Sequence, residues 1–358
     1  MCSLPTAPFA EQHVARWVEE FVRRRPRLKL SRDPAGNLLV ELRGPKPRLP
    51  RWVFVAHMDH PGMIARRMLD RRTLLAEFRG GVQAAFLDRT PVRFLDGQAW
   101  VGGVVVHAQA HPRTGRAREV RVRVARPLPR GAIGMYDLPA AAIRGSMLDG
   151  RACDDLAGTA ACLAMLDALY RRPPASTVAA LLTRAEEVGF VGAIAAVKAR
   201  RLLGRSDRII SVETSAQQPV ARQGRGPIVR VGDKSSVFHS GLTAFLTQRA
   251  AALARRDKRF SYQRALMPGG TCEAAVFDAY GHMASALCVA LVHYHNMNVS
   301  RRRIAAERID VNDWRNMVRL FVDVARHGHE FAGGVDSLKR RVERTYARWR
   351  PLLKQSPI

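Results

Sequence analysis

The segment Trp52–Asp59 reads WVFVAHMD and predicts a buried strand that ends at two polar side chains. Its first five residues are all apolar, which is typical of a central strand covered on both faces. His57 and Asp59 come just beyond that apolar run. In open α/β sheets, ligands bind outside the carboxyl ends of the strands. The segment therefore predicts an α/β fold with a site at this edge of its sheet.

The same alternation of helices and strands recurs on both sides of residues 63–147. Apolar positions at helical spacing predict helices, and short apolar runs between turns predict strands. The expected helices cover residues 10–24, 155–169, 191–198, 241–254, 311–326 and 331–349. The expected strands cover residues 38–42, 52–56, 178–182, 208–212, 260–266 and 285–292. This order favours a mixed central sheet flanked by helices.

Residues 63–147 have a different character. Short β-like pieces alternate there with Gly, Pro and Arg turns, and no long helical pattern is present. We interpret this part as a small β-rich inserted domain. The catalytic domain would then comprise residues 1–62 and 148–358.

Four further segments along the chain each carry a side chain of a type that binds metal ions, and together with His57 they make the inventory of a two-metal site. Asp154 stands in DDLAG, Glu187 in EEVG, Glu213 in SVET and His295 in HYHN. Together with His57 they make two imidazoles and three carboxylates, which can hold two divalent cations with one carboxylate bridging. Glu186 remains as a spare carboxylate that can act as a base.

Each segment also has a structural interpretation. His57 can pair with Asp59 at a strand end, although Asp59 also suits a second role, accepting the other ring N–H of a metal-bound histidine. The Asp154-Asp155 pair can cap a helix, and Glu186-Glu187 can be solvated loop carboxylates. A carboxylate that ends a buried strand, as Glu213 would, needs a partner.

His295 is ambiguous for another reason, since His293 stands two residues away and either ring can be a core or surface histidine. The five positions are more informative together than singly, because most of them follow predicted strands. Their joint placement favours a metal site.

Composition limits the other classes of function. The net charge of +28 is compatible with nucleic-acid binding, but the basic residues are dispersed and have few interleaved aromatic residues, so general surface charge is the preferred interpretation. Five scattered cysteines without a Cys-x-x-Cys pair predict reduced thiols in the cytoplasm. The sequence contains no run of roughly 18 apolar residues, so we expect no membrane span. No signal peptide is recognised at the N-terminus.

These segments resemble the cocatalytic two-zinc aminopeptidases of the glutamyl aminopeptidase, or tetrahedral aminopeptidase (endoglucanase-like), type. The matching stretches are VAHMD, ACDDLAG, AEEVG, GGTCEA, YHN and the early DPAGNL, at residues 55–59, 152–158, 185–189, 269–274, 294–296 and 33–38. The family has a phosphorylase/hydrolase-like α/β fold that it shares with other two-zinc exopeptidases. The resemblance covers nearly the whole chain.

The resemblance implies a role for each residue. His57 and His295 would each bind one metal, Asp154 would bridge both, Glu187 and Glu213 would join one metal each, and Glu186 would be the general base. The Asp154–Asp155 peptide bond is expected to be cis. Zinc is the expected metal, with cobalt and manganese as alternatives. The backbone amides of Gly269, Gly270 and Thr271 would approach the substrate.

Two positions depart from the family pattern. Glu213 stands where the aminopeptidases more often have Asp, and Glu there is typical of related zinc carboxypeptidases and deacylases. His60 replaces an acidic residue. However, the insertion lies between His57 and Asp154, as in the tetrahedral aminopeptidases, whose inserted domain supports oligomer assembly. Carboxypeptidase-like relatives carry theirs after the third carboxylate ligand.

We therefore expect a cytoplasmic, homo-oligomeric metallo-aminopeptidase that removes N-terminal residues from peptides. The first alternative is a related zinc carboxypeptidase or N-acyl amidohydrolase. The second is a basic nucleic-acid-binding protein with a vestigial site. Against the second, no ligand position has been lost.

Overall fold

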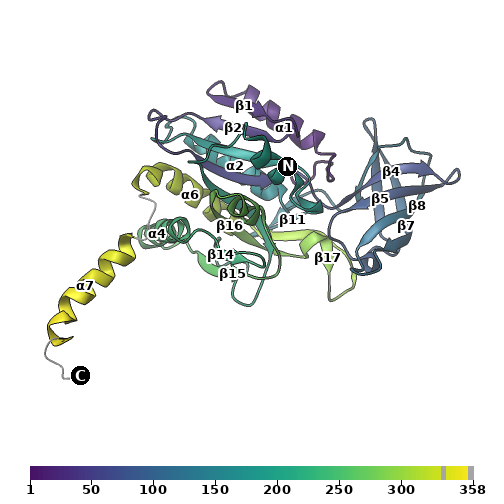
Figure 1. The fold of residues 1–358 in the computed structure, drawn as a ribbon. Coiled ribbons are helices and arrows are strands. Elements are labelled where there is room, and N and C mark those ends of the chain that lie inside the picture. Colours follow the sequence, from purple (N-terminus) through teal and green to yellow (C-terminus); the bar gives the residue numbers. More distant parts are fainter. Residues whose placement is uncertain (332–335, 354–358) are drawn as a thin grey trace.

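A computed structural model describes residues 1–331 and 336–353 of the chain. An eleven-stranded mixed sheet forms its centre (Figure 1). The main path of this sheet runs, in spatial order, through β1 (Leu28–Arg32), β2 (Leu38–Leu42), β12 (Val178–Thr183), β3 (Trp52–His57), β13 (Arg208–Ala216), β16 (Met283–Val292), β19 (Glu307–Asp310), β11 (Met147–Gly150) and β10 (Ala142–Arg144). Off this path, β14 (Ile228–Asp233) pairs with β16 and with β15 (Gln263–Met267).

The four strands in the middle of the sheet are parallel. β3 lies between β12 and β13, and β13 pairs in parallel with β16. All six residues of β3 are buried, because helices cover both faces of the sheet at this point. The carboxyl ends of the four strands therefore meet at one edge, which is the place that the apolar run before His57 predicted.

The pleat of β3 divides its side chains between two cores. Trp52, Phe54 and Ala56 face a cluster shared with α1 (Gln12–Arg23), α2 (Leu156–Leu169), α4 (Ser240–Arg256) and α6 (Val311–His327). Val53 and Val55 face a second cluster with α3 (Val191–Ala199) and α5 (Glu273–Ala279). The remaining helix is α7 (Asp336–Leu353), and short 3₁₀ turns lie at Ala84–Phe86, Glu186–Val188, Tyr294–Asn296 and Gly328–Glu330.

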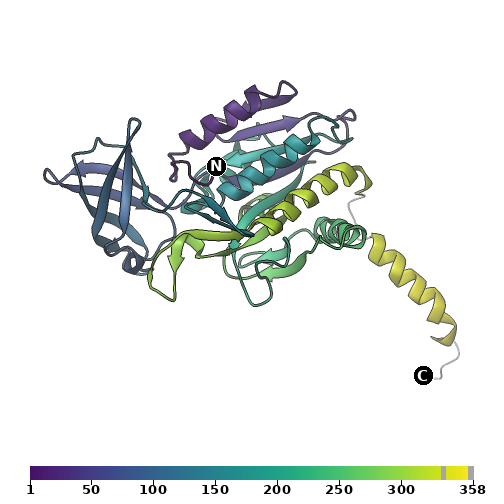
Figure 2. The ribbon, with the colours of Figure 1, turned by 180° about the vertical axis from the view of Figure 1, so that it is seen from behind.

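A closed six-stranded barrel projects from one end of the molecule (Figures 1 and 2). It is built from β4 (Gly62–Met68), β5 (Thr73–Arg79), β8 (Ala117–Val124), β7 (Ala99–Ala110), β6 (Pro91–Asp96) and β9 (Ile133–Tyr136), in that order around the barrel. Along β8 the residues alternate mostly between buried and exposed, so that Val120, Val122 and Val124 fill the barrel's own core. A two-stranded ribbon, β17 (Met297–Asn298) and β18 (Arg303–Ile304), lies beside this core.

The predicted fold class, an α/β fold with a mixed central sheet flanked by helices, is confirmed. Two expected strand boundaries were wrong by three residues or more. β13 continues to Ala216, so Glu213 lies inside a strand and does not end one. β15 begins at Gln263 instead of Phe260. The helix expected at residues 331–349 corresponds to α7, and residues 332–335 of that prediction lie outside the described part.

Several elements were not predicted individually, and β1, β14, β19 and α5 are among them. All are short, and β19 and α5 contain polar residues that interrupt their apolar pattern. In the described part of the chain, no helix is long and apolar enough to cross a membrane.

Candidate metal centre

The parallel strands bring the predicted ligands to one edge of the sheet. His57 is the last residue of β3, and its strand partner across β12 is Thr183, three residues before Glu186. Glu213 lies in β13, and the turn that follows β16 carries His295. Segments more than 200 residues apart in sequence therefore meet at this edge.

Asp154 lies between the two histidines. Its Oδ1 is 3.4 Å from Nε2 of His57, and its Oδ2 is 3.6 Å from Nε2 of His295. On the far side, Oε2 of Glu187 is 3.1 Å from the same nitrogen of His295. One carboxylate therefore presents one oxygen to each imidazole, as a bridging ligand between two ions does.

These spacings fit divalent metal ions. Zinc bonds to nitrogen and oxygen of about 2.0–2.1 Å in a tetrahedron separate the ligand atoms by about 3.3 Å. Buried oxygens also remain without hydrogen-bond partners among the described residues: Oδ1 of Asp154, Oε1 of Glu187 and Oε1 of Glu213. Unpaired buried carboxylate oxygens are costly, and metal coordination removes that cost.

Two groups of side chains are close enough to share an ion, and both contain His57. The first joins His57 to Asp154 and Glu187, and the second joins it to Glu186 and Glu213, with all ligand atoms of a group within 4.8 Å of one another. Glu186 thus lies as near to His57 as the candidate ligands do, with Glu213 contributed by β13 and Glu187 by the 3₁₀ turn Glu186–Val188.

The electrostatics of these side chains also favour cations. Burial raises the pKa of Glu213 to about 8, and Asp154 adds to this effect. Burial likewise raises the pKa of Glu186 well above its usual range, although His57 opposes the effect. Burial lowers the pKa of His295, but Glu187 outweighs it and raises the value to about 9. So many carboxylates can stay ionised here only beside positive charge, which divalent ions supply.

The backbone around Asp154 is held from behind. The Asp154–Asp155 peptide bond is cis, as the resemblance implied. Oε2 of Glu307 accepts hydrogen bonds from the backbone N–H groups of Cys153 and Asp154, at 2.7 and 3.0 Å. Nδ1 of His60 contacts the main-chain oxygen of Asp154, and its Nε2 lies 2.8 Å from Oδ1 of Asn296. His60 therefore holds the backbone of Asp154 in place without itself facing the candidate metal centre.

Asp155 turns away from the metals and caps α2. Its Oδ1 accepts the backbone N–H of Gly158 at 3.2 Å and the hydroxyl of Thr214 at 2.8 Å. A side chain on Gly158 would meet the Asp155 carboxylate at 2.2 Å. The N-cap interpretation of the DDLAG segment is therefore confirmed for Asp155, and Asp154 is left as the candidate metal ligand.

The Glu186-Glu187 loop is fixed by Asp59. Its two carboxylate oxygens accept the backbone N–H groups of Glu186 and Glu187, at 3.0 and 3.1 Å. Nδ1 of His57 lies 3.1 Å from the main-chain oxygen of Asp59 and 3.5 Å from its carboxylate. Asp59 therefore lies behind His57, as expected, but its main-chain oxygen is closer to Nδ1 of His57 than its carboxylate is. The carboxylate of Asp59 instead orients the loop that carries Glu186 and Glu187.

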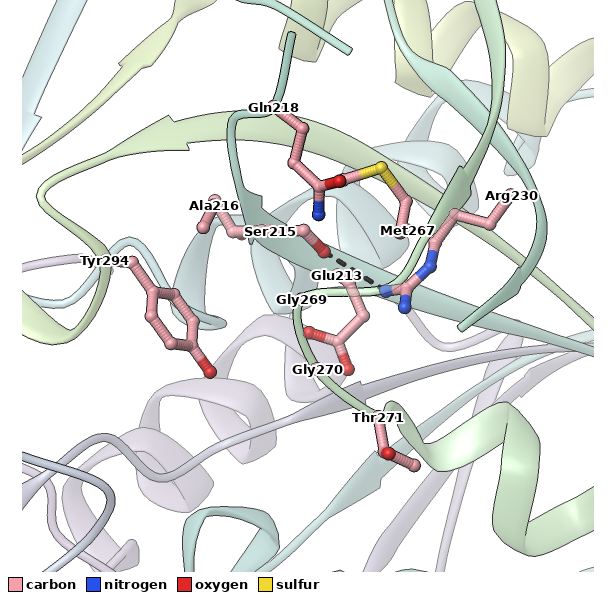
Figure 3. A pocket seen from close by; sticks show the side chains of 11 residues that line it. Glu213, Ser215, Ala216, Gln218, Arg230, Met267, Gly269, Gly270, Thr271 and Tyr294 are labelled. Atoms are coloured by element: carbon pink, nitrogen blue, oxygen red, sulfur yellow. Dashed lines mark hydrogen bonds between the residues drawn. The ribbon is translucent and has the colours of Figure 1, made fainter. Parts of the chain in front are cut away.

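A pocket of about 90 Å³ opens beside Glu213 (Figure 3). The predicted substrate-binding residues Gly269, Gly270 and Thr271 line one side of it, and Tyr294 lines another. At its floor lies Arg230, a 3% exposed residue of β14. The pocket therefore adjoins the candidate metal centre through Glu213.

Three residues of this region had no role in the sequence analysis: Arg230, Glu273 and Glu307. Glu273 was visible within the GGTCEA segment, and it is fully buried at the start of α5. Arg230 and Glu307 stand in short strands without a motif, so no local pattern distinguishes them.

Comparisons with known proteins place this geometry in a family. Similar structures include an aminopeptidase of the archaeon Desulfurococcus kamchatkensis, with 21% identity, a TM-score of 0.75, and coverage of 93% of this chain and 95% of that one. The TET1 peptidase of Pyrococcus horikoshii has 19% identity and a TM-score of 0.74, over 90% and 96% of the two chains. An M18-family aminopeptidase of Thermotoga maritima has 14% identity and a TM-score of 0.65, over 91% and 94%.

At such identities these structures establish the fold alone. A search of curated proteins found no match. The family model of the M42 glutamyl aminopeptidases, however, matches residues 36–320, which include all five predicted ligands. The chain therefore belongs to the M42 glutamyl aminopeptidase family and is a metal-dependent exopeptidase, a hydrolase of peptide bonds.

Proposed function

We propose that the enzyme is an aminopeptidase that uses two divalent ions, with zinc as the expected metal. His57, Asp154 and Glu213 would hold one ion, and Asp154, Glu187 and His295 the other. The placement of the two Asp154 oxygens opposite the two imidazoles carries this proposal. Paired divalent ions of this kind lower the pKa of water and polarise a carbonyl group.

Glu186 is the proposed general base. Its Oε2 lies 3.9 Å from Nε2 of His57, and its side chain is 11% exposed, so it borders both the ions and the open side of the site. Such a carboxylate can take a proton from the attacking water and pass it to the leaving amine. The backbone N–H groups of Glu186 and Glu187 both donate to the Asp59 carboxylate. These hydrogen bonds would fix the loop so that Glu186 acts as the base while Glu187 binds metal.

A substrate panel tests the aminopeptidase proposal against the carboxypeptidase or N-acyl amidohydrolase alternative. The free α-amine of a peptide would lie near the acidic ligands, so aminoacyl substrates should turn over and their N-acetylated forms should not. Turnover of N-blocked peptides with release of C-terminal residues would instead support the alternative. The position of the barrel between His57 and Asp154 in sequence favours the first result.

We also propose that the substrate's first side chain is acidic and lies against Arg230. One guanidinium nitrogen, Nη1, donates to Oγ of Ser215 at 3.1 Å (Figure 3), while Nε has no hydrogen-bond partner among the described residues. Burial lowers the pKa of this arginine, but nearby groups that include Glu213 and Asp233 are close enough to raise it overall. In the described part of the chain, neither of these two carboxylates forms an ion pair with it. A carboxylate entering the pocket would pair with the guanidinium group that lines it, and guanidinium–carboxylate hydrogen bonds are strong when buried.

Assembly is the last part of the proposal. The TET1 peptidase of Pyrococcus horikoshii can assemble into a tetrahedron or a large octahedral shell, and a further structure of PhTET1 contains a dodecamer. We propose that this chain also forms a closed homo-oligomer, and that the barrel, within an inserted domain of residues 63–147, contributes to its interfaces. All five cysteines are free and buried, which supports the expected cytoplasmic location.

A further inference from the structure

The last helix, α7, stands apart from the body of the enzyme. It projects beyond α4 at the end of the molecule opposite the barrel (Figures 1 and 2). Each residue from Lys339 to Leu352 is exposed. The family match ends at residue 320, so α7 lies outside the region that the family shares.

The exposed surface of α7 has an apolar side. Val342, Tyr346, Trp349 and Leu352 recur at intervals of four, three and three residues, which places them on one side of a helix. They are 56%, 55%, 50% and 53% exposed. At a rise of about 1.5 Å per residue, this apolar stripe is about 15 Å long. Large apolar side chains exposed in a row indicate a contact surface.

Positive charge surrounds the stripe. Six basic residues and two acidic ones give α7 a net charge of +4, and the basic ones are Lys339, Arg340, Arg341, Arg344, Arg348 and Arg350. An apolar stripe with Trp and Tyr, bordered by Arg and Lys, is the pattern of helices that lie in the plane of a membrane surface. There the aromatic rings lie at the headgroup level and the basic side chains contact anionic lipids.

We propose that α7 docks the enzyme on anionic membrane surfaces. The apolar stripe would enter the lipid interface, and the basic residues would contact the headgroups. The helix does not span the bilayer, in agreement with the absence of a spanning helix among the described residues. The inference stands independently of the peptidase chemistry.

Two other partners fit α7 less well. A second copy of this chain would present a like charge, because +24 of the total +28 lies outside α7. Nucleic acid would satisfy the basic residues, but it offers no apolar surface that would cover Val342 and Leu352. An anionic bilayer satisfies both the charge and the stripe.

Vesicle sedimentation with the full-length enzyme tests the proposal. Wild-type protein should sediment with phosphatidylcholine vesicles that contain roughly one-third phosphatidylglycerol, and hardly at all with pure phosphatidylcholine. The double variant Val342→Ser/Trp349→Ser keeps every charge, yet its partition should fall at least about tenfold. A matched control is Val106→Ser/Trp100→Ser on the barrel strand β7, where both residues are also exposed, and it should bind as wild type does.

A second pair of variants tests the charge. Vesicle binding should fall at least about tenfold in the α7 variant Arg341→Gln/Arg344→Gln/Arg348→Gln. It should not fall in the barrel variant Arg113→Gln/Arg118→Gln/Arg121→Gln, which loses the same amount of charge from exposed positions. Peptidase activity should remain at the wild-type level in all four variants, which shows that they fold.

Three results would overturn the proposal. Wild-type protein that fails to bind anionic vesicles is the first, and equal losses in the helix and barrel variants are the second. The third is a change of partner: if the stripe variant loses affinity for duplex DNA, or changes the particle mass in light scattering, with vesicle binding intact, α7 serves that other contact instead.

Discussion

Asp154 is the residue on which both proposed metal sites depend, and the chain devotes several buried groups to holding it. Glu307 binds its backbone N–H, His60 contacts its carbonyl oxygen, and a cis peptide bond joins it to Asp155. These supports come from strands and turns far away in the sequence. Asp154 was recognisable as a candidate ligand from the DDLAG segment, but Glu307 was not recognisable as its support, because the contact between them spans 153 positions.

The two neighbouring glutamates should respond differently to the same change. Glu186→Gln keeps the size of the side chain but cannot accept a proton, so kcat should fall about 10²–10⁴-fold while metal content stays at the wild-type level. Glu187→Gln should reduce metal content and lose activity as a consequence. Steady-state kinetics together with elemental analysis separate the two. If the Glu186→Gln variant lost its metal, the roles of general base and metal ligand would have to be exchanged between Glu186 and Glu187. If it turned over substrate at nearly the wild-type rate, Glu186 would not be the general base.

Arg230 should decide which first residue is cleaved. In Arg230→Met the volume is kept and the buried charge is removed, so kcat/KM for a glutamyl substrate should fall at least about tenfold relative to a leucyl one. Arg264→Met changes an exposed arginine of the neighbouring strand β15 and serves as the control. Equal losses for both substrates would contradict an acid-binding role, and would leave the metal proposal intact.

At the scale of the elements, the parallel strands β12, β3, β13 and β16 position the site. The apolar runs of these strands made their existence predictable. The boundary of β13 was missed because Glu213 and Thr214 are polar, although both are buried within it. The prediction used hydrophobicity, which ends the apolar run before Glu213. The strand itself continues to Ala216 because β13 pairs with β16 up to that residue. Tertiary pairing of this kind cannot be inferred from a short window.

The start of α2 gives a prediction at this scale. In Gly158→Ala the new methyl group collides with the Asp155 carboxylate, which Thr214 holds from the other side. The ligand loop should shift, so activity and metal affinity should both fall at least about tenfold. Gly102→Ala in β7 meets no atom within 4 Å and is the control. Metal titration of the two variants checks this, and equal affinities would show that the loop is not coupled to the cap.

At the scale of the whole molecule, the barrel and the sheet form separate cores. The change of pattern near residue 63 made a β-rich unit predictable, but not its closure, because closure depends on the antiparallel pairing of β4 with β9 across about 70 residues. The role of the barrel in the proposed assembly would depend on contacts between copies, which no local sequence pattern indicates.

Light scattering tests the proposed assembly. The native enzyme at micromolar concentration should have a mass several times the 39.8 kDa of one chain. Exposed residues of the barrel offer the first positions for charge-reversing variants that should reduce this mass. A strictly monomeric particle over a wide concentration range would contradict the assembly proposal and leave the peptidase proposal standing.

The most direct test of the two-metal centre is the metal content of the purified enzyme. After zinc reconstitution and removal of free metal, elemental analysis should find two ions per chain, and a chelator should abolish activity in a way that zinc restores. Asp154→Ala should lose both ions, whereas His57→Ala and His295→Ala should each lose mainly one. A folded wild-type protein that binds fewer than two ions, or an Asp154→Ala variant that retains both, would contradict the account.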